Sequence, residues 1–184
     1  MLFKLLKENL GVLLIFLAAF ISLNTLTPSA DLNEEVATDT YSLKRAFTHV
    51  EQMSQSPHGL GFDAHSDVRG YLIQELEKLG LEVLLQKGYT SGDWANVSEP
   101  INVITRIKGS SEVSAHALLL LSHYDSSPHS SFGASDAASG VATILEGVRT
   151  LLTSNEAPKN DIIIVFTDAG HARDRLTEGL IMCH

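Results

Sequence analysis

The chain has 184 residues, of which 44% are hydrophobic and 19% charged, a balance typical of a folded domain rather than a disordered chain. Its formal net charge is −9 with histidine counted as neutral, and no cluster of Lys and Arg follows the first few residues. Because clustered cations carry phosphate binding, we do not expect nucleic acid as a partner. The single cysteine, Cys183, excludes a disulfide framework and a thiolate metal cluster within one chain.

Residues 1–30 have the pattern of a signal peptide or a membrane anchor. Lys4 and Lys7 precede the apolar run Leu10–Leu23, whose 14 residues are fewer than the roughly 20 of a spanning helix and fit the roughly 7–15 of a signal-peptide core. A cleaved signal and an uncleaved anchor both fit, and a buried core helix is the third alternative. A cleaved signal and an uncleaved anchor both bring the N-terminal segment to a membrane. Both place the rest of the chain on the non-cytoplasmic side, secreted in the first case and membrane-anchored in the second. The polar, acidic residues 31–40 are expected to form a linker.

Helices and strands alternate along the rest of the chain. Apolar residues at three- and four-residue spacing predict helices over residues 40–54, 63–79 and 138–152. Short apolar runs predict strands over residues 81–86, 101–107, 117–122 and 161–167. The first two strands are expected to pair antiparallel, and Gly80 is expected to end the second helix. The last strand is expected to run parallel to a central strand, 117–122, through a right-handed crossover.

The chemistry of the chain is concentrated between Leu118 and Val141. Four leucines, typical of a strand buried on both faces, lead to His123 and Asp125. Ligands of open α/β sheets sit at the carboxyl ends of strands, so an imidazole with carboxylates there suggests a metal site. Asp125 is placed to accept a hydrogen bond from the second imidazole nitrogen and so to orient His123. Alternatively, His123 is a hydrogen-bonded polar residue at a strand end and Asp125 is a turn former.

Asp136 stands in a run of small residues, where the backbone can come close to whatever the strand end holds. It has two alternative roles: the N-cap of the following helix, or, if Ser139 is the cap, a ligand that bridges metal ions. Asp168, at the end of the next predicted strand, adds a third carboxylate to the expected polar rim.

The runs SHYDS, GASDAASGVA and DIIIVFTDA resemble the co-catalytic zinc aminopeptidases and carboxypeptidases, a family that includes bacterial leucyl aminopeptidases and glutamate carboxypeptidase II. The upstream run PHGLGFDAHSDVRGYLIQELEKLGLEV is similar to the membrane-bound branch of that family. The resemblance implies an α/β fold with a mixed, mainly parallel sheet flanked by helices. It also implies that His123 ligates one of two zinc ions, that Asp136 bridges them, and that Asp125 orients His123.

The sequence departs from this family after Ala169. There the family has two consecutive glutamates, the general base and a zinc ligand, whereas this chain has Gly170 and His171. Gly170 cannot accept a proton, while His171 can in principle bind zinc. Residues 170–184 bear no likeness to the family, so we expect 41–169 to be the N-terminal part of such a domain. A truncated or frameshifted gene product explains this pattern, and ordinary divergence of the C-terminus is the alternative.

By this resemblance, the expected function is zinc-dependent hydrolysis of a peptide substrate at its chain end. Because the general base and several ligands are missing, we expect the chain as given to have no appreciable peptidase activity. The alternative is a non-catalytic exported interaction module with an exopeptidase-like fold. A further alternative is that the chain does not fold stably, since a sheet edge and apolar helix faces would be uncovered.

Overall fold

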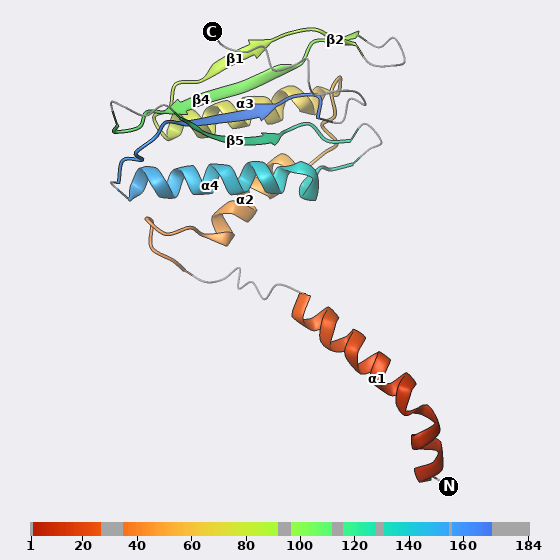
Figure 1. Cartoon of the computed structure of the whole chain (residues 1–184). Coiled ribbons are helices and arrows are strands. Elements are labelled where there is room, and N and C mark those ends of the chain that lie inside the picture. Colours follow the sequence, from red (N-terminus) through yellow and green to blue (C-terminus); the bar gives the residue numbers. More distant parts are fainter. Residues whose placement is uncertain are drawn as a thin grey trace. The chain divides into compact units, whose positions relative to one another are not determined.

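The computed structural model describes residues 2–26, 35–91, 97–111, 116–127, 131–154 and 156–170. His171, expected as a substitute zinc ligand, lies outside the described residues together with the rest of the tail. The chain divides into two compact units, Met1–Leu32 and Asn33–His184. Figure 1 shows a helix in the first unit and a mixed sheet with helices in the second.

In the described residues, the first unit is one helix, α1 (Leu2–Leu26). Its segment Asn9–Leu26 has 18 residues and is long and apolar enough to cross a membrane. The helix continues past the predicted apolar run, and at its end Asn24 and Thr25 donate side-chain hydrogen bonds to carbonyl oxygens one turn earlier, at 2.9 and 3.0 Å. This length and composition agree with both a membrane anchor and a signal peptide.

The described residues of the second unit form the helices α2 (Leu43–Met53), α3 (Asp63–Lys78) and α4 (Ser139–Thr153). Each lies where a helix was predicted. Helix α2 begins later than predicted because Ser42 is its N-cap, with its hydroxyl accepting a hydrogen bond from the Arg45 N–H at 3.2 Å. Helix α3 ends as predicted, since Gly80 follows the C-cap with φ +77°, a conformation that glycine adopts without strain.

The sheet of the second unit has the strand order β1-β4-β6-β5, with β1 (Leu84–Lys87), β4 (Ile101–Ile107), β6 (Ile162–Thr167) and β5 (Leu118–His123). As predicted, β1 and β4 pair antiparallel and β5 and β6 pair parallel. The prediction that β5 is central is wrong, because β6 inserts between β4 and β5 and leaves β5 at one edge of the described sheet. A separate, unpredicted ribbon pairs β2 (Thr90–Ser91) with β3 (Val97–Ser98).

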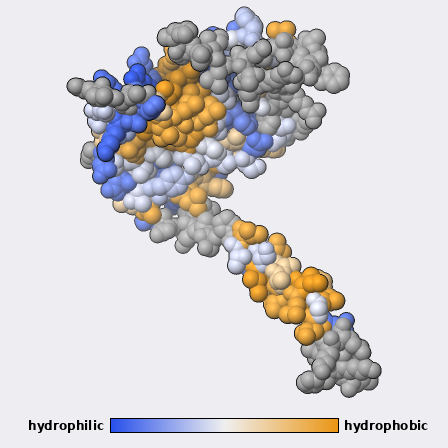
Figure 2. Space-filling view, viewed as in Figure 1, coloured by the Kyte–Doolittle hydropathy of each residue, from blue (hydrophilic) through white to orange (hydrophobic). Residues whose placement is uncertain are grey.

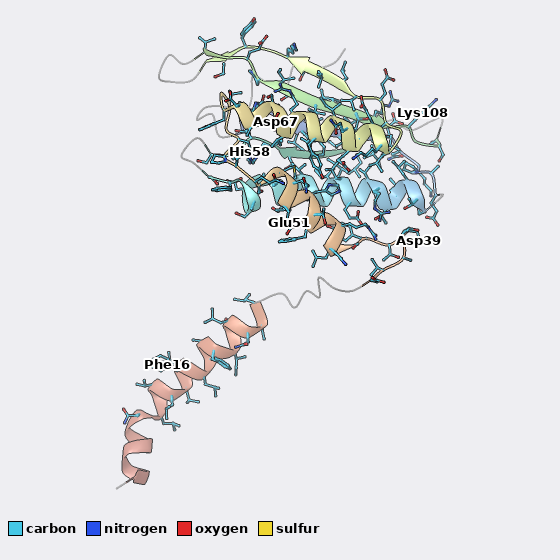
Figure 3. The ribbon with its side chains drawn as sticks, turned by 180° about the vertical axis from the view of Figure 1, so that it is seen from behind. Phe16, Asp39, Glu51, His58, Asp67 and Lys108 are labelled. Atoms are coloured by element: carbon cyan, nitrogen blue, oxygen red, sulfur yellow. The ribbon has the colours of Figure 1, made fainter. Side chains whose placement is uncertain are left out.

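One face of the four-stranded sheet carries the core. Alternate residues of the two inner strands are buried there: Val103, Thr105, Ile107, Ile162, Ile164 and Phe166. Apolar residues of α3 and α4 join the same core, and α3 lies behind the sheet in Figure 1 and in front of it in Figure 3. The predicted burial of β5 on both faces is wrong, because Leu119 and Leu121 are exposed. The predicted α/β fold, a mixed sheet flanked by helices, is confirmed.

A buried carboxylate fixes the start of the second unit to α4. The Glu146 carboxylate accepts hydrogen bonds from Ser42 N at 2.8 Å, from Arg45 Nε at 3.0 Å, and from Arg149 Nε at 2.7 Å. Arg149 also donates to the carbonyl of Thr38. Burial alone would raise the pKa of Glu146, but these hydrogen bonds outweigh it and hold the pKa below its usual value. The ionised carboxylate therefore connects residues 38–45 to α4.

Candidate zinc site

Two parallel strand ends form the floor of the candidate site. His123 of β5 stands beside Thr167 of β6 in the parallel register, so the residues that follow each strand lie next to each other. The Tyr124 N–H donates to the Thr167 carbonyl at 3.0 Å, and the Gly170 N–H donates to Asp125 Oδ1 at 2.7 Å. The Asp125 carboxylate, which is buried, thereby joins the two strand ends.

The three residues predicted for the site come together at this edge. His123 Nδ1 lies 3.1 Å from the backbone oxygen of Asp125 and 3.2 Å from its carboxylate oxygen Oδ1. Both atoms are acceptors, so they favour a proton on Nδ1 when Nε2 binds a metal ion. His123 Nε2 lies 3.0 Å from Asp136 Oδ1. The hydrogen bond with Asp125 raises the pKa of His123, against the opposing effect of burial.

Asp136 does not cap α4. Its backbone is non-helical, with φ −132° and ψ 91°, and α4 begins at Ser139 without a side-chain cap. The preceding irregular segment, η1 (Ala134–Ala138), follows Gly133, whose φ is +68°. This path turns the Asp136 carboxylate toward His123, which is the geometry expected if the carboxylate is available for a metal.

The distances allow a test of whether these residues suit zinc. Tetrahedral zinc holds imidazole nitrogen and carboxylate oxygen at about 2.0–2.2 Å, so two of its ligand atoms lie about 3.4 Å apart. His123 Nε2 and Asp136 Oδ1 are 3.0 Å apart, close to that separation. In the part of the chain that the structure describes, no group of three or more His, Cys, Asp or Glu side chains gathers around a common point. These residues thus fit part of a zinc site, with two ligands and an orienting carboxylate.

Asp168 belongs to a different cluster, contrary to its expected place on the rim. Its Oδ1 lies 2.8 Å from His65 Nε2, and its Oδ2 accepts hydrogen bonds from Ile101 N at 2.9 Å and from the Tyr124 hydroxyl at 3.0 Å. Burial and the neighbouring Asp168 charge raise the pKa of Tyr124, so the phenol stays protonated and donates. The imidazole of His65 stacks on the Tyr124 ring at 5.1 Å. Asp168 is therefore a buried structural carboxylate.

The loop that follows His123 is held by a residue that sequence patterns did not single out. His58 lies in the turn between α2 and α3 (Figure 3), is buried, and donates from its backbone N–H to Ser126 Oγ at 2.9 Å. A Cβ at Gly133 would lie 2.9 Å from Ser126 Cβ and 3.0 Å from His58 Cε1. His58 thus packs between the two ends of the loop that separates His123 from Asp136. In the sequence, Pro57-His58-Gly59 appeared only as the start of the run that is similar to the membrane-bound branch.

Gly170 lies directly against the imidazole of His123. A Cβ on Gly170 would be 2.4 Å from His123 Cγ and 2.6 Å from His123 Cβ, far inside normal carbon–carbon contact. The position at which the resembling family has its general base is therefore closed to any side chain while His123 keeps this orientation.

A comparison with protein families finds a match for the part of the chain that holds this arrangement. A model of peptidase family M28 matches residues 102–171, which include the strand ends and all three predicted site residues. This part of the chain is similar to the M28 peptidases. The resemblance to zinc exopeptidases is thus confirmed.

The curated relatives extend far beyond the part that matches this chain. The vacuolar membrane protease of Candida dubliniensis is 29% identical over 181 residues, and that of Candida albicans is 32% identical over 146 residues. The alignments cover 88% and 77% of this chain but 18% and 16% of those proteins. The chain thus spans less than a fifth of the length of these relatives, and their names agree with the predicted membrane-bound branch.

Solved structures of other proteins share this fold. A Zn-dependent exopeptidase from Parabacteroides distasonis is 25% identical with a TM-score of 0.62, and glutaminyl cyclase from Porphyromonas gingivalis is 26% identical with a TM-score of 0.61. They match 78% and 76% of this chain, and 54% and 46% of their own chains are covered. Because one is named an exopeptidase and the other a cyclase, the fold alone does not fix the reaction.

Proposed function

We propose that this chain carries part of a zinc exopeptidase site, that it binds zinc through His123 and Asp136, and that it does not hydrolyse peptides by itself. The observation that carries the proposal is the approach of His123 Nε2 to Asp136 Oδ1 at 3.0 Å, with His123 Nδ1 turned toward Asp125. In a complete site of this class, zinc lowers the pKa of a bound water and polarises the scissile carbonyl of a peptide. A relative with two such ions would act on a free chain end.

Each residue has a defined part in this proposal. His123 and Asp136 hold the ion, and Asp125 keeps the proton of His123 on Nδ1 so that Nε2 can act as the ligand atom. Asp125 and Asp168 are both buried and accept backbone hydrogen bonds, so neither is placed to take a proton from water. Gly170 has no side chain to do so. Among the described residues at the two strand ends, a general base is therefore lacking.

A second candidate function is a non-catalytic interaction module. The observation in its favour is that the His123 ring occupies the space that the Cβ of any side chain at position 170 would need. Such a module keeps the fold without a need for metal.

A zinc titration separates the two functions. The full chain in mild detergent is unfolded with urea in the presence and absence of zinc, together with the variants His123→Ala, Asp136→Asn and the control His116→Ala, which removes an exposed histidine near the start of the same strand. If the site binds zinc, an excess of 100 times Kd stabilises wild type and control by about 2.7 kcal/mol and leaves the site variants unchanged. No stabilisation of the wild type indicates the module. Chelator-sensitive release of amino acid from aminoacyl-nitroanilides contradicts the proposed inactivity.

We also infer that α1 attaches the chain to a membrane, with residues 41–169 as the exopeptidase-like body on the non-cytoplasmic side. The length of the apolar segment, the two lysines before it, and the membrane proteases among the relatives support this arrangement.

A further inference from the structure

A pair of buried ionisable side chains lies next to the strand ends, outside the candidate zinc site. His65, in the first turn of α3, and Asp168, directly after β6, are both buried, and His65 Nε2 lies 2.8 Å from Asp168 Oδ1. His65 comes from the face of the sheet on which α3 packs, whereas Figure 2, in the same view as Figure 1, shows apolar side chains gathered over the opposite face. Because burial of such groups is costly unless they are hydrogen-bonded, this contact is specific.

Asp168 contacts two chain segments that lie next to His123. Its Oδ2 lies 3.0 Å from the hydroxyl of Tyr124, the residue directly after His123. Its Oδ1 accepts a hydrogen bond from the Ala169 N–H at 2.8 Å, at the start of the turn that follows β6. A third hydrogen bond, from the Ile101 N–H at 2.9 Å, joins the same carboxylate to β4. One buried carboxylate therefore fixes the end of β5 and the turn after β6 relative to each other.

The turn after β6 connects Asp168 to the carboxylate that orients His123. The Gly170 N–H donates to Asp125 Oδ1 at 2.7 Å, and the same oxygen lies 3.2 Å from His123 Nδ1. The position of this oxygen thus depends on the position of Gly170, two residues after Asp168. Carboxylates that orient a metal-binding histidine are themselves held by hydrogen bonds, and loss of such outer contacts weakens metal binding by about 10–100-fold.

His65 holds the Asp168 carboxylate in the orientation that makes these contacts. Its imidazole also stacks on the Tyr124 ring, with the ring centroids 5.1 Å apart and the planes at 17°. Without the contact from Nε2, a buried oxygen of Asp168 has one hydrogen-bond partner fewer, and leaving it so is costly. We expect the carboxylate to turn or to admit water in response, and either change displaces Tyr124 and Ala169.

We propose that His65 is a positioning residue for the candidate zinc site. Through Asp168 it fixes Tyr124 and the turn after β6, and thereby the orientation of the His123 ring. This proposal rests on the zinc binding proposed above. A purely structural role of His65 predicts a different result, in which its loss lowers the stability of the whole fold and leaves the His123 ring unchanged.

The test uses four variants of the full chain in mild detergent. His65→Leu keeps an apolar side chain and removes the donor, whereas His65→Gln keeps an N–H donor at the end of the side chain. Tyr124→Phe removes only the hydroxyl. Val148→Ala is the control, because it shortens a side chain that is 2% exposed and lies about 13 Å along α4 from the first residue of that helix. Urea unfolding measures the stability of each variant.

Two measurements follow the site itself. Nitrogen-15 NMR of the histidine rings, with the His123 signals assigned from His123→Ala, needs no metal, and isothermal titration calorimetry gives the Kd for zinc. We expect His65→Leu and Tyr124→Phe to shift the His123 signals, and His65→Leu to raise the Kd about tenfold or more. We expect His65→Gln to restore both nearly to their wild-type values. Val148→Ala should lower the stability and change neither.

Failure of the positioning role and failure of zinc binding give different results. If the wild type binds no zinc, the zinc site is contradicted, and the NMR signals still decide whether His65 positions His123. Unchanged His123 signals in His65→Leu overturn the positioning role, and Tyr124→Phe decides in the same way if His65→Leu does not fold. An unchanged zinc Kd in His65→Leu also overturns it, as does an equal effect of His65→Gln or of Val148→Ala.

Discussion

Replacement of Gly170 by alanine tests the geometry of the strand ends most directly. The added methyl group would lie 2.4 Å from His123 Cγ, whereas carbon atoms in good contact are about 3.5–4.0 Å apart. The ring cannot move freely, because Asp125 faces one of its nitrogens and Asp136 the other. The overlap must therefore be relieved by displacing the turn after β6 or by breaking one of these hydrogen bonds.

The expected cost follows from these contacts. Overpacking of a close-packed site costs about 1–3 kcal/mol, and loss of one hydrogen bond adds about 1 kcal/mol. Gly147→Ala is the matched control, since a Cβ at this position in α4 meets nothing within 4 Å. There the same change should stabilise the helix by about 0.5–1 kcal/mol. We thus expect the two glycine-to-alanine variants to change stability in opposite directions.

Urea unfolding followed by circular dichroism measures the difference, and the NMR signals of the His123 ring report its displacement. A Gly170→Ala protein as stable as Gly147→Ala, with unchanged His123 signals, would refute the contact. The same geometry predicts that Gly170→Glu, which places the family's glutamate at this position, does not produce peptidase activity by itself.

Two further predictions concern the rest of the chain. Glu146→Gln should lower the free energy of unfolding at neutral pH by about 1.5–3 kcal/mol, because it removes the charge of a buried carboxylate that accepts hydrogen bonds from two arginines. The pKa of Glu146 is lower in the folded than in the unfolded protein, so the ionised carboxylate stabilises the fold above its unfolded pKa, and this stabilisation is lost as pH falls through its folded pKa. The Gln variant lacks this titrating group and should therefore lose less stability than the wild type on acidification. Residues 96–98 read Asn-Val-Ser, an N-glycosylation sequon. If residues 41–169 lie in the lumen when the chain is expressed in yeast, endoglycosidase should increase the gel mobility of the wild type and leave that of Ser98→Ala unchanged. Digestion of these residues by protease added to sealed microsomes would contradict this topology.

The strand-end residues were predictable because their grouping depends on local rules. Two apolar runs each end in polar residues, and parallel pairing of those runs brings His123 and Asp125 to one edge. Asp136 follows in a short loop, so its approach to His123 needs only the turn at Gly133. The zinc-binding roles of these residues remain predictions, since the grouping is what the structure describes.

The predictions that were wrong or missing concern contacts between residues far apart in the sequence. Asp168 was expected beside His123, but its partner His65 lies 103 residues away and no local pattern links the two. The edge position of β5 depends on which strand enters between β4 and β5, a choice that apolar composition does not encode. His58 was missed for the same reason, since its partner Ser126 is 68 residues away.

The insertion of β6 between β4 and β5 also has a consequence for folding during synthesis. β6 is the last described strand to leave the ribosome, yet it occupies the middle of the sheet and pairs with both neighbours. Until Thr167 has emerged, the edges of β4 and β5 that pair with β6 have no partner strand. Pairing of β6 with β4 is slow, because the two strands are far apart in the sequence. During this interval the nascent chain is open to aggregation and to chaperone binding. A nonsense mutation just before Ile162 would therefore remove the centre of the sheet and prevent its assembly.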